Sequence, residues 1–211
     1  MRRARAHPLL LALLMLGAAG GWLAGVPAAR ASDPGTGEAV AAARGCGTCH
    51  ALPGGATGTR PGPAFLSPAP PRPGAEIVRG LWNHIPEMRR HVTARALAWP
   101  VMRPEEMEAL LAFLGRAPGP ERSADPDRGR LLVMERGCLR CHGLGGSGGR
   151  TASDLGIRRS GGLAMLAATL WNTAPAMVDA LDQGGLPFPA LQPGEMADVL
   201  GFLGGAGRGT R

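Results

Sequence analysis

Two copies of one short motif organise this chain: Arg44-Gly45-Cys46-Gly47-Thr48-Cys49-His50 and Arg136-Gly137-Cys138-Leu139-Arg140-Cys141-His142. The copies lie 92 positions apart, and together they contain all four cysteines of the 211 residues. Each has the form Cys-x-x-Cys-His preceded by Arg-Gly. A match of this length at a fixed spacing indicates an internal repeat.

The repeat extends well beyond the cysteine motifs. Asp33-Pro34 recurs as Asp125-Pro126 at the same spacing; further along the spacing becomes 89, where Leu81-Trp82-Asn83 matches Leu170-Trp171-Asn172, Met88 matches Met177, and Phe113-Leu114 matches Phe202-Leu203. The pattern predicts two tandem domains, over residues 32–115 and 125–205. Residues 116–124, in a stretch rich in Gly and Pro, are the expected linker, and residues 206–211 are the expected C-terminal tail.

Local patterns predict a mostly helical chain. Short helices are expected over residues 38–44, 104–114, 128–136 and 193–203. An Asp-Pro pair precedes the first helix of each repeat, as is typical of an N-cap followed by proline in the first turn. The segments 51–73 and 143–160 contain many Gly and Pro residues and are expected to be irregular loops ahead of a further helix. Because no alternating apolar pattern predicts a strand, the expected fold class is all-α.

The first 31 residues have the features of an export signal. Residues 1–8 are basic, residues 9–26 are apolar and rich in Leu and Ala, and Ala29-Arg30-Ala31 places small residues where a signal peptidase cuts. We therefore predict a signal peptide over residues 1–31 and a periplasmic location for the remainder. The alternative is an uncleaved segment that anchors the protein in the membrane.

Composition excludes one partner class and favours a bound cofactor. Four of the 23 basic residues and none of the 16 acidic residues lie in the first 31 positions, so the formal charge of +7 falls to +3 for the remainder. This charge gives no reason to expect a nucleic-acid partner. The chain has four Phe, four Trp and no Tyr, but 34 Gly and 20 Pro. Two domains this small and this poor in aromatic residues are expected to need a cofactor to complete their cores.

The Cys-x-x-Cys-His motif predicts covalent haem attachment. Two thiols at this spacing on a helical turn can add to the two vinyl groups of one porphyrin, and the adjacent histidine then binds the iron. Two haem c groups are therefore expected, one on Cys46, Cys49 and His50 and one on Cys138, Cys141 and His142. A structural zinc site would have its cysteine pairs closer together in the sequence. A disulfide or a thioredoxin-like redox pair would not need a histidine after both second cysteines, and the βαβ context of a thioredoxin-like pair is missing from this sequence.

The sixth iron ligand should recur at matched positions in both repeats and have a side chain that binds iron. Met88 and Met177 meet both conditions, in Leu-Trp-Asn-His-Ile-Pro-Glu-Met and Leu-Trp-Asn-Thr-Ala-Pro-Ala-Met. Other candidates are Met107 and Met196, which recur on the apolar stripe of the last helix, and His84, His91 and Met102, which occur in the first repeat only. We predict Met88 and Met177, because a methionine on an apolar helical stripe usually fills a core.

The attachment motif, the Trp-Asn-x-x-Pro-x-Met segment and the closing Glu-Met helix resemble the class I c-type cytochromes, here in a tandem dihaem arrangement over residues 33–204. The resemblance implies a few helices wrapped around each haem, with His on one side of the iron and Met on the other. It also implies a backbone carbonyl that orients the histidine. Gly62-Pro63 offers one in the first repeat, where the second repeat has Thr151-Ala152.

Three further pairs have weaker claims to a role at the haems. Arg60 and Arg150 are candidate propionate ligands, Trp82 and Trp171 are candidates for packing at the haems or in the ordinary core, and Asn83 and Asn172 are candidates for a bond near the distal ligand or for a helix cap.

An iron with His and Met on its two axial sides has no open position for a substrate. We therefore predict an electron-transfer protein, not an enzyme, that passes electrons between redox protein partners, some of which are expected at the membrane. One alternative is a dihaem oxidoreductase with an open or displaceable ligand, of the peroxidase or thiosulfate-oxidising type. Another is a cytochrome subunit of a larger dehydrogenase or oxidase.

Overall fold

A computed structural model of the chain describes residues 34–53, 60–65, 72–115, 122–156 and 162–205. Within these ranges the chain is all-α apart from one minimal hairpin. Its elements are α1 (Pro34–Ala43), η1 (Cys46–Thr48), α2 (Gly74–Ala94), α3 (Pro104–Gly115), α4 (Pro126–Glu135), η2 (Cys138–Arg140), β1 (Gly143–Leu144), β2 (Ser147–Gly148), α5 (Gly162–Gln183) and α6 (Glu195–Gly205). The expected signal peptide, tail and much of the linker lie outside the described residues.

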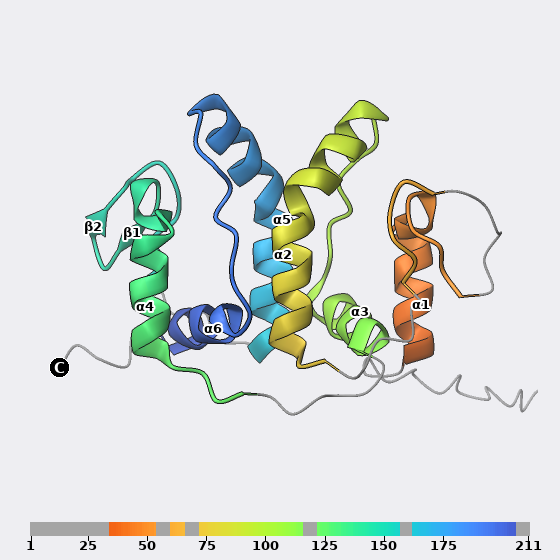
Figure 1. Cartoon of the computed structure of the whole chain (residues 1–211), viewed down its shortest axis with the longest axis horizontal. Helices are drawn as coiled ribbons and strands as arrows, with labels where there is room; N and C mark the ends of the chain where they lie inside the picture. Colours follow the sequence, from red (N-terminus) through yellow and green to blue (C-terminus); the bar gives the residue numbers. More distant parts are fainter. Residues whose placement is uncertain (1–33, 54–59, 66–71, 116–121, 157–161, 206–211) are drawn as a thin grey trace, which may run out of the picture.

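The two repeats have the same order of helices, and Figure 1 shows them on opposite sides of the molecule. The long helices α2 and α5 lie side by side in the centre. Helices α1 and α3 flank them on one side, and α4 and α6 on the other. One hydrophobic core runs through both repeats. The hairpin β1–β2 replaces part of the irregular loop expected over residues 143–160, with Gly143 opposite Gly148.

Each outer pair of helices crosses at a glycine. In α1, a Cβ placed on Gly37 would lie 2.5 Å from Phe113 Cβ and even closer to the carbonyl oxygen of Ala109, both on α3. In α4, a Cβ on Gly129 would lie 2.9 Å from Phe202 Cβ on α6 and closer still to backbone atoms of Asp198. Only glycine lets the two backbones approach this closely. Since Gly37 and Gly129 are matched positions of the repeat, the same crossing occurs twice.

The N-cap and the terminating glycine expected for the helix before the cysteine motif are both present in α4 of the second repeat. Asp125 accepts hydrogen bonds at Oδ1 from the backbone N–H groups of Asp127 and Arg128, so the predicted N-cap of α4 is confirmed. After this helix, Gly137 has φ 76°, a left-handed conformation that favours glycine, and Gly45 has the same φ after α1. This turn starts the 3-10 helix that carries the cysteines. Asp33, the matching N-cap candidate, lies outside the described residues.

The central helices are longer than a sequence with internal prolines suggests. Helix α2 contains Pro86 and α5 contains Pro175. A proline cannot donate to the carbonyl four residues earlier, which in α5 is that of Trp171. The indole Nε1 of Trp99, from the first repeat, donates to this carbonyl at 3.1 Å. A partner from the other repeat therefore satisfies the acceptor that the proline leaves free.

The Trp-Asn pair that occurs in both repeats holds the repeats together, because each copy bonds to the backbone of the other repeat. Trp82 Nε1 donates to the carbonyl of Pro189 at 2.7 Å, and Trp171 Nε1 donates to the carbonyl of Pro100 at 2.6 Å. Their rings pack at a tilt against matched partners, with centroids 4.6 Å apart for Trp82 and Phe188 and 4.6 Å apart for Trp171 and Trp99. Both tryptophans are buried. Core packing is therefore the main role of these side chains, and the core in question lies between the repeats.

The two asparagines each make a pair of hydrogen bonds to the backbone of one residue of the other repeat. Asn83 donates to the carbonyl of Leu191 at 2.8 Å and accepts from its N–H at 2.9 Å, and Asn172 does the same with Met102 at 2.8 and 2.9 Å. Each amide thus pairs with a backbone segment of the other repeat as a neighbouring strand would. A helix-capping role is wrong for Asn83 and Asn172, because both lie in the interior of α2 and α5.

No helix within the described ranges combines the length and apolar character that a membrane span requires.

Candidate cofactor site

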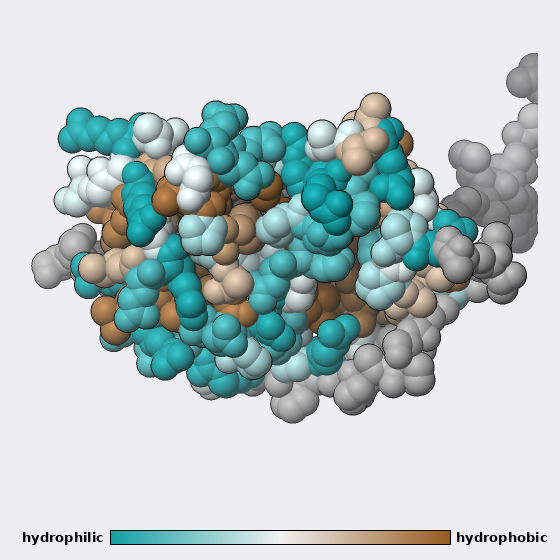
Figure 2. All heavy atoms as spheres, turned by 45° about the horizontal axis from the view of Figure 1, so that its top comes forward, coloured by the Kyte–Doolittle hydropathy of each residue, from teal (hydrophilic) through white to brown (hydrophobic). Residues whose placement is uncertain are grey.

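A cavity of about 630 Å³ opens between the cysteine turn η1, α2 and α3 of the first repeat. Its walls are mainly apolar, with contributions from Ile77, Leu81, Val92, Leu110 and Leu114. Figure 2 shows the molecule from a side where apolar surface is visible in recesses between hydrophilic side chains. Ligand sites in proteins usually have this size and this apolar character, with a few polar groups that fix the ligand.

The cysteine motif forms one wall of the cavity. After the left-handed Gly45, the 3-10 turn η1 brings the backbone N–H of His50 to the carbonyl of Cys46 at 2.9 Å. This compact turn lets Cys46, Cys49 and His50 all line the same cavity. The local sequence therefore places two thiols and one imidazole together, as the sequence analysis expected of an attachment motif.

His50 is fixed in orientation from two sides. Its Nδ1 lies 2.8 Å from the carbonyl oxygen of Pro63, so Nδ1 carries the proton and Nε2 is left as the acceptor. The ring also stacks on Phe65, with centroids 4.5 Å apart and planes 14° apart. Burial lowers the pKa of His50, and the hydrogen bond to Pro63 offsets this only in part. The imidazole is therefore neutral near pH 7, the form that binds a metal. The predicted carbonyl behind His50 is confirmed.

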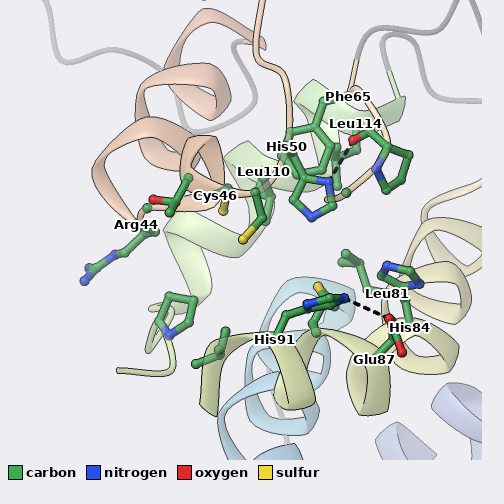
Figure 3. Close-up of a pocket in the computed structure, with 18 of the residues that line it drawn as sticks. Arg44, Cys46, His50, Phe65, Leu81, His84, Glu87, His91, Leu110 and Leu114 are labelled. Atoms are coloured by element: carbon green, nitrogen blue, oxygen red, sulfur yellow. Dashed lines mark hydrogen bonds and ion pairs between the residues drawn. The ribbon is translucent and has the colours of Figure 1, made fainter. Parts of the chain in front are cut away.

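Helix α2 forms the wall opposite His50. Figure 3 shows His84, Glu87 and His91 on this helix, across the cavity from His50. Met88 lines the same cavity. His91 Nε2 lies 2.9 Å from Glu87 Oε1. Met88, the sixth ligand expected from the sequence, therefore shares the cavity with His50 and both cysteines.

The other methionine candidates lie elsewhere. Met107 has no exposed surface and packs in the core between α3 and the central helices, and its counterpart Met196 is 1% exposed. Met102 is also buried, with its backbone bonded to Asn172. These three residues do not line the cavity. The apolar stripe on which Met107 and Met196 were placed is thus a core stripe.

The first cavity contains one residue from the second repeat. Trp171 of α5 lines it, next to Trp99, against which its ring packs at a tilt. From the sequence, Trp171 was expected to pack within its own repeat. The reciprocal packing of the repeats was not visible in the local sequence, so this contribution was missed.

The second motif has the same local geometry as the first. The N–H of His142 donates to the carbonyl of Cys138 at 3.0 Å, and His142 Nδ1 lies 2.7 Å from the carbonyl oxygen of Ser153. The orienting carbonyl belongs to Ser153, one residue beyond the Thr151-Ala152 pair. Met177 is half-buried on α5, packed against the core, at the position of α5 that matches Met88.

Asp154 shapes the loop that carries this carbonyl. Its carboxylate accepts hydrogen bonds from the backbone N–H groups of Gly145, Gly146 and Gly156, at 3.0, 2.8 and 2.6 Å. These bonds lower the pKa of Asp154 and hold the hairpin against the segment that leads to α5. The matching segment around Pro63 contains no Asp or Glu, so comparing the two repeats could not predict this role of Asp154.

Two matched ion pairs connect the motif to the last helix of each repeat. Arg44 Nη2 lies 2.5 Å from Glu106 Oε1, and Arg136 Nη2 lies 2.7 Å from Glu195 Oε2. Burial by itself would raise the pKa of Glu106. The backbone N–H of Arg103 and the guanidinium groups of Arg44 and Arg103 outweigh burial and lower the pKa to about 2. All four residues recur at matched positions of the repeat, but nothing in the sequence predicted that each Arg would pair with a Glu.

The loop arginines differ from each other. Arg60 donates through Nη1 to the carbonyl of Gly47, within the cysteine turn, and Arg150 is exposed. Neither lines the cavity. A propionate role for Arg60 and Arg150 stays a prediction.

The four cysteines, all in the described part of the chain, are free thiols. Burial raises the pKa of Cys46 and of Cys138, which keeps both sulfurs protonated at neutral pH. Within the described ranges, no three His, Cys, Asp or Glu side chains are grouped closely enough to hold a metal ion.

Comparison with known proteins gives no match: no family model, curated protein or solved structure is significantly similar to this chain.

Proposed function

We propose that the chain is an exported dihaem c-type cytochrome that carries electrons between redox protein partners. The observation that carries the proposal is the cavity in which Cys46, Cys49 and His50 form one wall and Met88 lies on another. In this proposal each repeat is a class I cytochrome c domain, wrapped around one covalently held haem.

The residues present fit a haem at the first site. Cys46 and Cys49 lie on one turn, the arrangement that addition to two vinyl groups of one porphyrin requires, and burial raises the pKa of the Cys46 thiol. His50 has its Nδ1 bound to a carbonyl, which leaves a neutral Nε2 for iron. The apolar lining suits the porphyrin face, and Met88 supplies a thioether within the same cavity.

The second repeat supports a second haem through its matching turn. Cys138, Cys141 and His142 follow a left-handed glycine as in the first repeat, and a carbonyl again binds Nδ1 of the histidine. Met177 takes the place of Met88. We assign Met177 as the sixth ligand there on the basis of the repeat.

A haem in such a site supplies a one-electron couple. The protein residues would fix it covalently, fill both axial positions with His and Met, and exclude water through the apolar walls. With no open axial position, transfer of electrons is favoured over chemistry on a substrate. The donor and acceptor are expected to be redox proteins outside the cytoplasm, reached after export by residues 1–31.

The test of haem attachment is the mass of the denatured protein. The full chain is produced in a bacterial host that exports and matures c-type cytochromes, and the intact mass and the visible spectrum are measured after denaturation. We expect two haems that stay on the polypeptide. The paired variants Cys46→Ala with Cys49→Ala, and Cys138→Ala with Cys141→Ala, should each keep one. A denatured wild-type polypeptide without haem would refute the proposal.

A second measurement separates the carrier from a dihaem oxidoreductase. The reduced protein is mixed with carbon monoxide, which binds ferrous haem only where an axial position is open. We expect no rapid spectral change for a carrier. Rapid binding at one haem, together with turnover of peroxide, would instead support the enzyme alternative.

A further inference from the structure

The two proposed haem sites differ along the helix that faces the histidine of the first site. In the first repeat, α2 presents His84, Glu87 and His91 beside Met88 at the cavity. The matched positions of α5 are Thr173, Ala176 and Ala180. Residues that hold the scaffold recur in both repeats, including the Trp-Asn pairs and the Arg-Glu pairs. The wall opposite the attachment motif is therefore a place where the repeats diverge in side chains that could bind a ligand.

His84 is the imidazole of this wall that is free to bind a ligand. His91 is engaged, with Nε2 at 2.9 Å from Glu87 Oε1 and Nδ1 at 3.1 Å from Arg95 Nη1. His84 makes no hydrogen bond to any residue in the described ranges, although it lines the cavity. His84 lies across the cavity from His50.

His84 also lies on the same face of α2 as Met88. The two residues are four positions apart, so their side chains are neighbours one helical turn from each other. Thr173, the counterpart of His84 in α5, bonds its hydroxyl to the carbonyl of Thr169 at 2.8 Å and has no group that binds haem iron. The first site thus offers two iron-binding side chains on this wall, and the second offers Met177 only.

We propose that His84 is an alternative axial ligand of the first site, able to bind iron in place of Met88. This inference rests on the proposed haem function. It makes the two centres unequal: the first can hold iron between two imidazoles, and the second can hold it only between imidazole and thioether. Since methionine ligation raises the reduction potential relative to a second histidine, the first centre has the lower potential whenever His84 is bound. Imidazole nitrogen is also a harder ligand than thioether sulfur, which favours His84 for ferric iron.

The test compares the two matched methionine variants in the full-length holoprotein. Met88→Ala and Met177→Ala are oxidised, and the spin state of each haem is read by electron paramagnetic resonance and by the visible spectrum. We expect Met88→Ala to keep both haems low-spin, because His84 replaces the lost thioether. We expect Met177→Ala to give one high-spin haem, because Thr173 cannot bind. A high-spin first haem in Met88→Ala would overturn the inference.

A double variant identifies the replacement ligand. Met88→Ala combined with His84→Thr, which installs the residue found at the matched position of α5, should give a high-spin first haem. A haem that stays low-spin in this double variant would assign the ligand to another residue, such as His91, and would overturn the role of His84. Failure of the wild-type protein to attach haem would reject the proposed function itself. Attached haem with the wrong spin states would reject only the inference.

Discussion

Replacement of Gly37 by alanine tests the helix crossing on which the first site is built. The added Cβ would lie 2.5 Å from Phe113 Cβ, about 0.9 Å inside the 3.4 Å at which ordinary van der Waals contact begins, and closer still to the carbonyl oxygen of Ala109. Backbone atoms cannot rotate away as a side chain can. Helices α1 and α3 must therefore move apart by roughly 1 Å, at the upper end of the 1–3 kcal/mol that overpacking typically costs.

A gain in helix propensity opposes this cost. Alanine is favoured over glycine inside a helix by about 1 kcal/mol, so the net loss for Gly37→Ala should be about 2 kcal/mol. For a chain of this size that loss lowers Tm by roughly 4–8 °C. The assay is unfolding by urea and by heat, followed by circular dichroism. Gly129→Ala, at the matched crossing of α4 and α6, should behave in the same way.

The matched control is Gly204→Ala in α6. A Cβ on Gly204 would lie 3.4 Å from Leu166 Cδ1, an ordinary contact, and the φ of Gly204 is not in the left-handed region. This variant should be as stable as the wild type or more stable by up to about 1 kcal/mol. If Gly37→Ala were as stable as Gly204→Ala, the close helix crossing would be refuted.

Three further substitutions test the interface, the ion pair and the helix cap. Asn83→Ala leaves the N–H of Leu191 without a partner and its C=O with only the 3.5 Å bond from Arg79 Nη1, and should cost about 2 kcal/mol of unfolding free energy, measured in urea; a loss below about 0.5 kcal/mol would contradict the reciprocal pairing. Glu106→Gln should cost on the order of 2 kcal/mol at pH 7. The pKa of Glu106 is about 2 in the folded state and 4.5 in the unfolded state, so this stabilisation is complete above pH 4.5 and is lost as the pH falls towards 2. The difference in unfolding free energy between wild type and variant, measured in urea, should therefore be smaller at pH 3 than at pH 7. A constant difference would exclude the ion pair as its cause. Asp125→Ala should cost about 1 kcal/mol through the lost cap of α4, while Asp125→Asn should be close to neutral in thermal unfolding.

Local chemistry accounts for what the sequence could predict. The N-cap at Asp125 and the carbonyl behind His50 follow from patterns within a few residues of each other, or from the resemblance to cytochromes. The all-α class follows from apolar stripes with helical spacing. Helix α2 was harder to predict because Pro86 normally ends a helix. Here a continuous helix tolerates it.

Contacts between the two repeats could not be predicted from neighbouring residues in the sequence. Asn83 and Leu191 are 108 positions apart, and nothing near either residue indicates that an amide will pair with a distant backbone. The repeat did contain a usable signal: the Trp-Asn pair recurs, and so does the proline whose carbonyl accepts from the tryptophan. Residues that recur together and belong neither to the attachment motif nor to an apolar stripe are candidates for a symmetric interface.

The pattern of what recurs and what differs separates the scaffold from the site. Gly37 and Gly129, the Arg-Glu pairs and the Trp-Asn pairs recur because each holds two segments of the scaffold together: two helices at the glycines, the cysteine motif and the last helix at the ion pairs, and a central helix and the backbone of the other repeat at the Trp-Asn pairs. His84 and Thr173 differ at a position where the first residue faces a cavity and the second bonds back to its own helix. Under the proposed function, this difference would make the two centres unequal, and two different reduction potentials would let one chain pass an electron in a preferred direction.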